Sequence, residues 1–189
     1  SGLAGIGLSL ISLYLEEKKI EYLDKCESIA SHIEKIIKDN NELTVTDWSS
    51  VPIGLIDGWS GISLFYTALY SVTNKKDYYL KSIDYINRDL ERCRVDEDTK
   101  TLQTLDDNHR LLPYLSGGSI GIGIAIWYLN FVNDGNLFEE ELKQIINLNE
   151  VRCTFSGGLF DGGGSFLLIP PMANVSNNIT EHIEMAIRK

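Results

Sequence analysis

Apolar residues recur at two spacings along the chain, and the first spacing predicts helices that expose one face to water. In residues 21–37 and 77–93, apolar side chains stand three or four positions apart, with polar side chains between them. This period places the apolar residues on one stripe of an α-helix. The stripes consist of Tyr22, Cys26, Ile29, Ile33 and Ile36, and of Tyr79, Ile83, Ile86, Leu90 and Cys93.

A second kind of segment is apolar at almost every position and begins with glycine. Its members begin at Gly2, Gly58, Gly118 and Gly162, and they share the pattern Gly-x-x-Gly, with Ser165 replacing the second glycine in the last. The lead glycines are 56, 60 and 44 residues apart. Because apolar side chains surround each of these helices, we expect each to be covered on all sides.

The alternation of the two segment types predicts an all-α fold of repeated helical hairpins. In each unit the apolar helix lies towards the centre of the fold, and the helix with one apolar face packs on its outer side. The units stack because none can bury its apolar surface alone. About four units are present, beginning near residues 2, 58, 118 and 162 of one domain that spans residues 1–189. Glycines at these helix starts allow close backbone approach and leave N–H groups facing the enclosed space.

Two segments depart from this helical pattern. The stretch Thr99–Leu105 alternates weakly and predicts a short β-hairpin within the long connection of residues 94–117. A connection of this length is typical of functional loops. Pro170 and Pro171 are expected to stop the fourth buried helix early.

The two ends of the chain carry further expectations. Residues 177–189 predict a final helix with Thr180 as its N-cap. Ser1 stands directly before Gly2 with no initiator methionine, so we expect the chain to be part of a longer polypeptide. The apolar stretch of residues 1–15 is too short to span a bilayer.

The net charge excludes some classes of partner, and the cysteine content indicates the cellular compartment. The formal net charge of −10 repels nucleic acid and anionic membrane surfaces, so we expect neither as a partner. The three cysteines, Cys26, Cys93 and Cys153, are odd in number and far apart, which favours a reducing cytoplasm over a disulfide framework. Cys26 and Cys93 are expected to pack in the core, on the stripes of the one-sided helices.

The glycine-led motifs resemble those of the lanthionine synthetase C-like family, whose fold is an α/α toroid of seven helical hairpins. The resemblance rests on GLIDGWSG (residues 54–61), LLPYLSGGSIGIGIAIWYL (residues 111–129) and GLFDGGGS (residues 158–165). The second motif is most similar to the cyclase domain of class III lanthipeptide synthetases, which also carry lyase and kinase domains. The resemblance covers most of residues 1–169, or about four of the hairpins.

The resemblance implies a cyclase that acts on a precursor peptide. Such enzymes add a cysteine thiol to a dehydroalanine or dehydrobutyrine of the same peptide, so they must favour the thiolate and then protonate an enolate. Most members hold zinc with two cysteines and one histidine placed just before the glycine-led helices. Here those positions hold no cysteine or histidine, so we expect no cofactor and no metal, as in the class III subgroup. They are Ile56 and Asp57, Ser116 and Gly117, and Phe160 and Asp161.

Four residues are candidates for moving protons in this reaction. His109 neighbours several charged residues in the long connection, and histidine titrates near neutral pH; it is either a catalytic base or a solvated loop residue. Asp57 and Asp161 precede lead glycines, where they either act near the cavity or form the N-caps of the buried helices. Tyr114 either donates a proton to the enolate or packs with its hydroxyl satisfied.

Three further residues are candidates for binding the peptide. Arg110 either holds an anionic intermediate or pairs with Asp106 and Asp107. Trp59 either lines a cavity or packs in the core, and Ser116 is either a site residue or a neutral helix cap.

Two other functions remain open at this stage. In the first, the domain is catalytically silent and serves as a binding or structural platform for the rest of the synthetase. In the second, the chain is a different α/α toroid, such as a glycoside-processing enzyme, in which Asp57 and Asp161 form a carboxylate pair.

Overall fold

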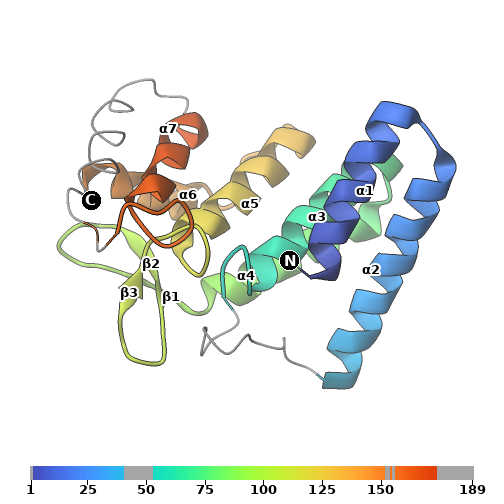
Figure 1. Cartoon of the computed structure of the whole chain (residues 1–189). Coiled ribbons are helices and arrows are strands. Elements are labelled where there is room, and N and C mark those ends of the chain that lie inside the picture. The colour runs from blue at the N-terminus through green and yellow to red at the C-terminus, as the bar shows by residue number, and fades with distance from the viewer. Residues whose placement is uncertain (1, 41–52, 152–153, 155, 174–189) are drawn as a thin grey trace.

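The computed structural model describes residues 2–40, 53–151, 154 and 156–173, and it is mostly helical with one small antiparallel sheet (Figure 1). The all-α prediction is therefore confirmed at the level of helical content. The longer helices are α1 (Leu3–Glu17), α2 (Ile20–Asn40), α3 (Trp59–Thr73), α4 (Lys76–Leu90), α5 (Ser119–Asn133) and α6 (Glu139–Ile146). The shorter elements are β1 (Cys93–Val95), β2 (Leu102–Leu105), β3 (Leu111–Leu112), the 3₁₀ segments η1 (Asn147–Glu150) and η2 (Gly163–Leu168), and α7 (Ile169–Met172).

Three glycine-led helices, α1, α3 and α5, lie side by side and run in the same direction, with α3 in the middle (Figure 1). Each has 15 residues and begins directly after a glycine N-cap with extended backbone. Each also ends at a left-handed residue whose N–H donates to a carbonyl four positions earlier. These end residues are Lys18, Asn74 and Asp134, each 16 positions after its lead glycine.

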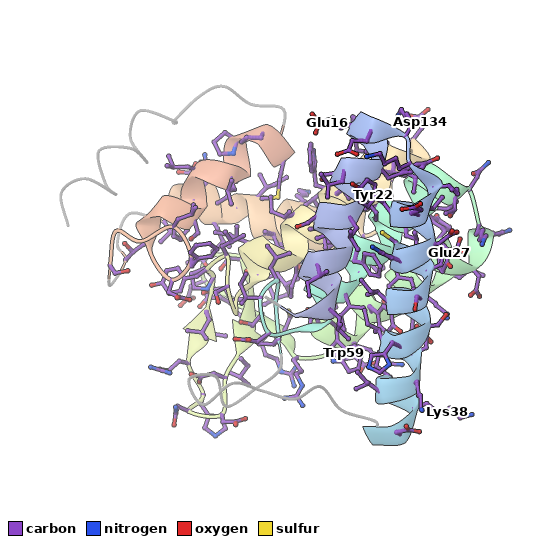
Figure 2. All side chains as sticks on the ribbon, turned by 45° about the vertical axis from the view of Figure 1, so that its right-hand side comes forward. Glu16, Tyr22, Glu27, Lys38, Trp59 and Asp134 are labelled. Atoms are coloured by element: carbon purple, nitrogen blue, oxygen red, sulfur yellow. The ribbon has the colours of Figure 1, made fainter. Side chains whose placement is uncertain are left out.

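The one-sided helices α2 and α4 pack on the outside of this row, as their sequence pattern predicts. In α2 the buried side chains follow a helical stripe, and α2 runs back along α1, with Glu16 near one end of the pair and Lys38 near the other (Figure 2). In α4 the helix ends at Leu90, so the prediction that Cys93 lies on its stripe is wrong. Cys93 is buried on strand β1, where its thiol lies 3.5 Å from the Asp89 carbonyl oxygen.

The long connection between α4 and α5 folds into a three-stranded sheet. Strand β2 pairs antiparallel with β1 and with β3, so the predicted β-hairpin is confirmed and extended by one strand. The register places Cys93 opposite Thr104 and Leu105 opposite Leu111. This sheet carries the chain from the end of α4 to the start of α5.

The fourth glycine-led unit is short and differs from the prediction. It consists of η2 followed by α7, and Pro170 and Pro171 lie in the first turn of α7 instead of ending a helix. Proline is accepted there because first-turn N–H groups have no partner within the helix. Cys153 and the helix predicted for residues 177–189, with its Thr180 cap, lie outside the described residues.

Helix α1 is not covered on every side, so this expectation is wrong for the first unit. Its Ile6 side chain is 53% exposed and its Leu13 side chain 38% exposed, whereas most of α3 and α5 is buried. The physical reason is its place in the row, because α1 has a glycine-led neighbour on one side only among the described helices.

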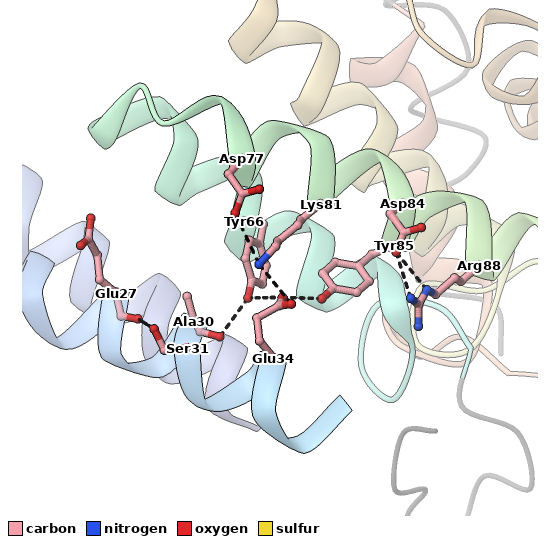
Figure 3. A network of polar contacts seen from close by, with 10 residues as sticks. All are labelled: Glu27, Ala30, Ser31, Glu34, Tyr66, Asp77, Lys81, Asp84, Tyr85 and Arg88. Atoms are coloured by element: carbon pink, nitrogen blue, oxygen red, sulfur yellow. Dashed lines mark hydrogen bonds and ion pairs between the residues drawn. The ribbon is translucent and has the colours of Figure 1, made fainter. Parts of the chain in front are cut away.

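A polar network joins the first two hairpins at Glu34 on α2 (Figure 3). Its Oε1 accepts hydrogen bonds from the hydroxyls of Tyr66 on α3 at 2.7 Å and Tyr85 on α4 at 2.6 Å, and its Oε2 pairs with Lys81 at 3.1 Å. Burial acts to raise the pKa of Glu34, but these three partners outweigh it and hold the pKa below its usual value. The network therefore favours a charged carboxylate that fixes α2 against α3 and α4.

The second glycine of the motif has a steric role that differs between units. A Cβ atom on Gly61 would lie 2.1 Å from the Leu55 carbonyl oxygen, while a Cβ atom on the equivalent Gly5 would meet no atom within 4 Å. The loop before α3 therefore folds over the helix only because Gly61 has no side chain.

We expect Gly61→Ala to lower the free energy of unfolding by about 1–3 kcal/mol, because the added methyl group must displace backbone. Gly5→Ala is the matched control, and it should leave stability unchanged or raise it by up to about 1 kcal/mol through helix propensity. Urea titration monitored by circular dichroism measures both. An equal effect of the two substitutions would contradict the steric role.

Candidate functional site

Three loops that precede the glycine-led helices form one continuous edge, which we call the rim (residues 53–58, 113–118 and 156–162). The N–H of Ile56 donates to the Ser116 carbonyl oxygen at 3.2 Å, and the N–H of Ser116 donates to the Phe160 carbonyl oxygen at 2.9 Å. All three residues stand two positions before a lead glycine. Equivalent positions of successive units are thus bonded to one another, and the bonds bring three helix starts to one place.

A groove of about 510 Å³ opens beside the rim, between α1, α2 and α3. Most of its lining is apolar, and Asp57 is the one ionisable side chain among the described residues that line it. The first turns of α1 and α3 both border the groove, so backbone N–H groups at these helix starts lie close to it. The lining comprises residues 2–5 and 8 of the first unit, 33, 36 and 37 of α2, and 55–58, 61, 62 and 64 of the second unit.

Asp89 is the residue that organises the start of α3, and sequence reasoning missed it. It lies on the last turn of α4, fully buried, and its Oδ2 accepts hydrogen bonds from the Gly54 N–H at 3.1 Å and from the N–H and hydroxyl of Ser60 at 2.7 and 2.6 Å. Its Oδ1 accepts from the Trp59 N–H at 3.3 Å. One carboxyl group from the outer helix thereby caps the inner helix and fixes the loop that carries Asp57.

The sequence held a signal for this residue. Asp89 stands three positions after Ile86 and one before Leu90, so helical spacing places it beside the predicted apolar stripe, and in the structure it is buried with Ser82, Tyr85 and Ile86. An acidic residue on a buried stripe requires several donors, because burying an unpaired charge is costly.

Burial raises the pKa of Asp89 to about 7, even though its hydrogen bonds from Ser60, Trp59 and Gly54 act to lower it. The raised pKa means that the folded chain holds a proton that the unfolded chain releases near pH 3.8. The contribution of Asp89 to stability is therefore complete below pH 3.8 and declines as the pH rises towards 7.

We compare the free energy of unfolding of the native chain with that of Asp89→Asn. The native value minus the variant value should fall by a few kcal/mol as the pH rises from about 4 to about 7. The asparagine side chain of the variant does not titrate, so the difference between the two proteins isolates this carboxyl group. Urea titrations at a series of pH values measure it. A difference that stays constant with pH, or grows, would contradict the raised pKa.

Asp57 and Asp161 do not cap the helices that follow them, so this prediction is wrong. The N-caps are Gly58 and Gly162, and the first N–H groups of α3 are bound by Asp89. Both aspartates belong to the rim, but they lie in its first and third loops with the loop of residues 113–118 between them.

His109 and Arg110 lie together on the turn between β2 and β3, away from the groove lining. The Arg110 guanidinium forms an ion pair with Asp106 at 2.7 Å, so the pairing predicted for Arg110 is confirmed with Asp106. His109 is exposed with a left-handed backbone, and its N–H donates to the Asp106 carbonyl oxygen. The turn borders a smaller depression of about 310 Å³ that Arg92 and Arg94 also line.

Trp59, Tyr114 and Ser116 occupy three different settings near the rim. Trp59 is buried and stacks on Tyr85 with ring centroids 5.5 Å apart, and the Arg88 guanidinium lies 4.5 Å from the centre of the Trp59 ring. These contacts support the interpretation of Trp59 as a core residue. The half-buried Tyr114 ring meets Phe166 edge to face. Ser116 is not the cap of α5, which is Gly118; it acts through its backbone in the rim.

The described part of the chain holds no cluster of three or more His, Cys, Asp or Glu side chains suited to a metal ion. None of the described helices combines the length and the apolar character needed to cross a membrane. A comparison of the chain with protein-family models found no match.

Proposed function

We propose that this chain is part of the cyclase domain of a class III-type lanthipeptide synthetase, with an α/α toroid fold. It adds cysteine thiols of a dehydrated precursor peptide to dehydroalanine or dehydrobutyrine, and it does so in the cytoplasm, alongside lyase and kinase domains of the same synthetase. The observation that carries the proposal is the rim, where equivalent positions of three glycine-led units are hydrogen-bonded beside an apolar groove. The glycine-led motifs supply the family resemblance.

The groove offers an environment that favours the reacting thiolate. The first turn of α1 contains no acidic residue and has no side-chain cap, so no described residue of that turn neutralises the positive end of its helix dipole. An apolar lining by itself disfavours a thiolate, and the helix N-terminus opposes this because its positive end stabilises the negative charge. In α3, by contrast, Asp89 occupies the equivalent N–H groups.

The chemical step is a conjugate addition in which two residues of the rim move the proton. Asp57 accepts the thiol proton, and the thiolate attacks the β-carbon of the dehydroamino acid to form the C–S bond. The electron pair of the C=C bond moves through the α-carbon into an enolate, and Tyr114 donates a proton to the α-carbon. The Tyr114 hydroxyl is then reprotonated through Asp57 or water, so the net reaction consumes and releases no proton.

The apolar lining also supports a second candidate function, a catalytically silent platform that binds the precursor. Asp57 is the one ionisable side chain among the described lining residues, and His109 lies on the sheet turn. A groove of this composition holds an apolar peptide segment without any catalytic group.

The two candidates differ in their response to Asp57→Asn in the complete synthetase. The cyclase proposal predicts that ring closure slows by about 10²-fold while dehydration continues, because a positioned acid–base group contributes about that much. Thiol alkylation followed by mass spectrometry counts the unclosed cysteines. Asp134→Asn, at the opposite end of α5, is the matched control and should close rings at the normal rate.

Three results would overturn parts of this assignment. Normal ring closure in Asp57→Asn together with normal closure in Tyr114→Phe would favour the platform. A loss of closure in His109→Ala, but not in Asp57→Asn, would move the base to the β2–β3 turn. If Asp57→Asn lost both precursor binding and ring closure, Asp57 would be assigned to binding.

A further inference from the structure

Phe160 and Asp161 stand in the third loop of the rim, and the proposed reaction uses neither of them. The Phe160 side chain is 52% exposed, and Asp161 is also exposed. Their backbones are nevertheless held in place. The Phe160 carbonyl oxygen accepts a hydrogen bond from the Ser116 N–H at 2.9 Å, and the Asp161 carbonyl oxygen accepts one from the Ser156 hydroxyl at 3.1 Å. The loop is thus fixed through its carbonyl groups, while an aromatic ring and a carboxylate remain open to solvent.

The two positions directly before a lead glycine are accessible in all three rim loops. In the middle loop they hold Ser116 and Gly117, which are only half-buried although a bonded loop lies on each side. In the first loop the Ile56 side chain is 43% exposed. Accessibility at these positions is therefore a property of the rim loops, and a bound peptide can reach it along the whole rim.

The charge of the rim indicates the chemistry of the side chain that it binds. The three rim loops contain Asp57 and Asp161 and no lysine, arginine or histidine, and the whole chain has a formal net charge of −10. A lysine or arginine side chain combines a charged head, which pairs with a carboxylate, and an alkyl stem, which packs on apolar surface. The exposed carboxylate of Asp161 and the exposed ring next to it in the chain suit these two parts.

The spacing of the rim loops relates Asp161 to the residues that react. Hydrogen-bonded extended chains lie about 5 Å apart, so the two bonded steps from the loop of Asp57 to the loop of Asp161 span about 10 Å. An extended peptide covers this distance in about three residues. Tyr114 belongs to the loop between the two, so a peptide that reacts at Asp57 and Tyr114 reaches Asp161 with a residue about three positions further along.

We propose that Asp161 determines substrate specificity by binding a lysine or arginine side chain of the precursor peptide, about three residues from the reacting cysteine, while Phe160 packs against the alkyl stem of that side chain. This assignment rests on the proposed function, since it extends the path of the peptide from the groove across the rim. An exposed ion pair contributes little free energy, so Asp161 selects among precursors and does not hold them by itself.

Binding of a synthetic peptide tests this proposal without any reaction. The probe is a fluorescently labelled peptide amide with the sequence Gly-Lys-Leu-Ala-Ser-Ala-Leu-Lys-Gly, in which serine replaces the reacting cysteine and a lysine stands three positions away on each side. A second peptide has glutamine in place of both lysines. We expect the 189-residue chain to bind the lysine peptide about three- to fivefold more tightly than the glutamine peptide in anisotropy titrations.

Three variants of the chain locate the preference. Asp161→Asn should abolish it, and Asp161→Lys should reverse it in favour of a third peptide that has glutamate in place of both lysines. Asp134→Asn removes the same charge at the far end of α5 and is the matched control, which should keep the preference for lysine. All three variants should unfold at the temperature of the native chain, because both altered side chains are exposed.

Several results would overturn the proposal. These are absence of peptide binding, equal affinity of the native chain for the lysine and glutamine peptides, and a preference that survives in Asp161→Asn. An equal loss of preference in Asp134→Asn would assign the effect to net charge and would overturn it as well.

These outcomes are separate from those that test the reaction. Normal ring closure in Asp57→Asn and in Tyr114→Phe, together with a lysine preference that depends on Asp161, would reject the reaction and keep the binding site. Slow ring closure in Asp57→Asn, together with no dependence on Asp161, would reject the binding site and keep the reaction.

Discussion

The structure depends on satisfying the backbone groups at the beginnings of its buried helices. The first N–H groups of a helix have no partner within it, and burying them unpaired is costly. In α3 the partner is Asp89, a carboxyl group from the outer helix of the same hairpin. Between units, the rim loops bond to one another through Ile56, Ser116 and Phe160. The start of α3 is therefore completed by a group from its outer helix, and the loops before α3, α5 and η2 are bonded to one another, so these units depend on one another for polar contacts as well as for apolar packing.

This constraint also determines where a site can form. The bonds between the rim loops fix the start of α3, and the first turn of α1, which packs beside α3, borders the same groove. Asp57 enters the groove because Asp89 and Gly61 together fix the loop before α3. The candidate chemistry therefore follows from the same contacts that hold the rim, whereas the exposed turn with His109 is held separately by Asp106.

The glycine-led pattern predicted the positions of the buried helices, because a lead glycine and a long apolar run are local signals. Local signals could not predict that Asp89, instead of Asp57, binds the first N–H groups of α3, since that choice depends on how α4 packs against α3. They also could not show that Ile6 and Leu13 stay open, because exposure depends on neighbours and not on the residue itself. The prolines of α7 were misjudged for a related reason: proline ends a helix that precedes it but fits the first turn of one that follows.

The three left-handed end residues, Lys18, Asn74 and Asp134, give the inner helices a common length that the connections do not share. Lead glycines are 56 and then 60 residues apart, yet the helices between them stop at the same point. The difference in spacing is thus absorbed by the segments outside the row, such as the one that forms the sheet. A chain built in this way accommodates connections of different size while these three helices keep the same number of turns.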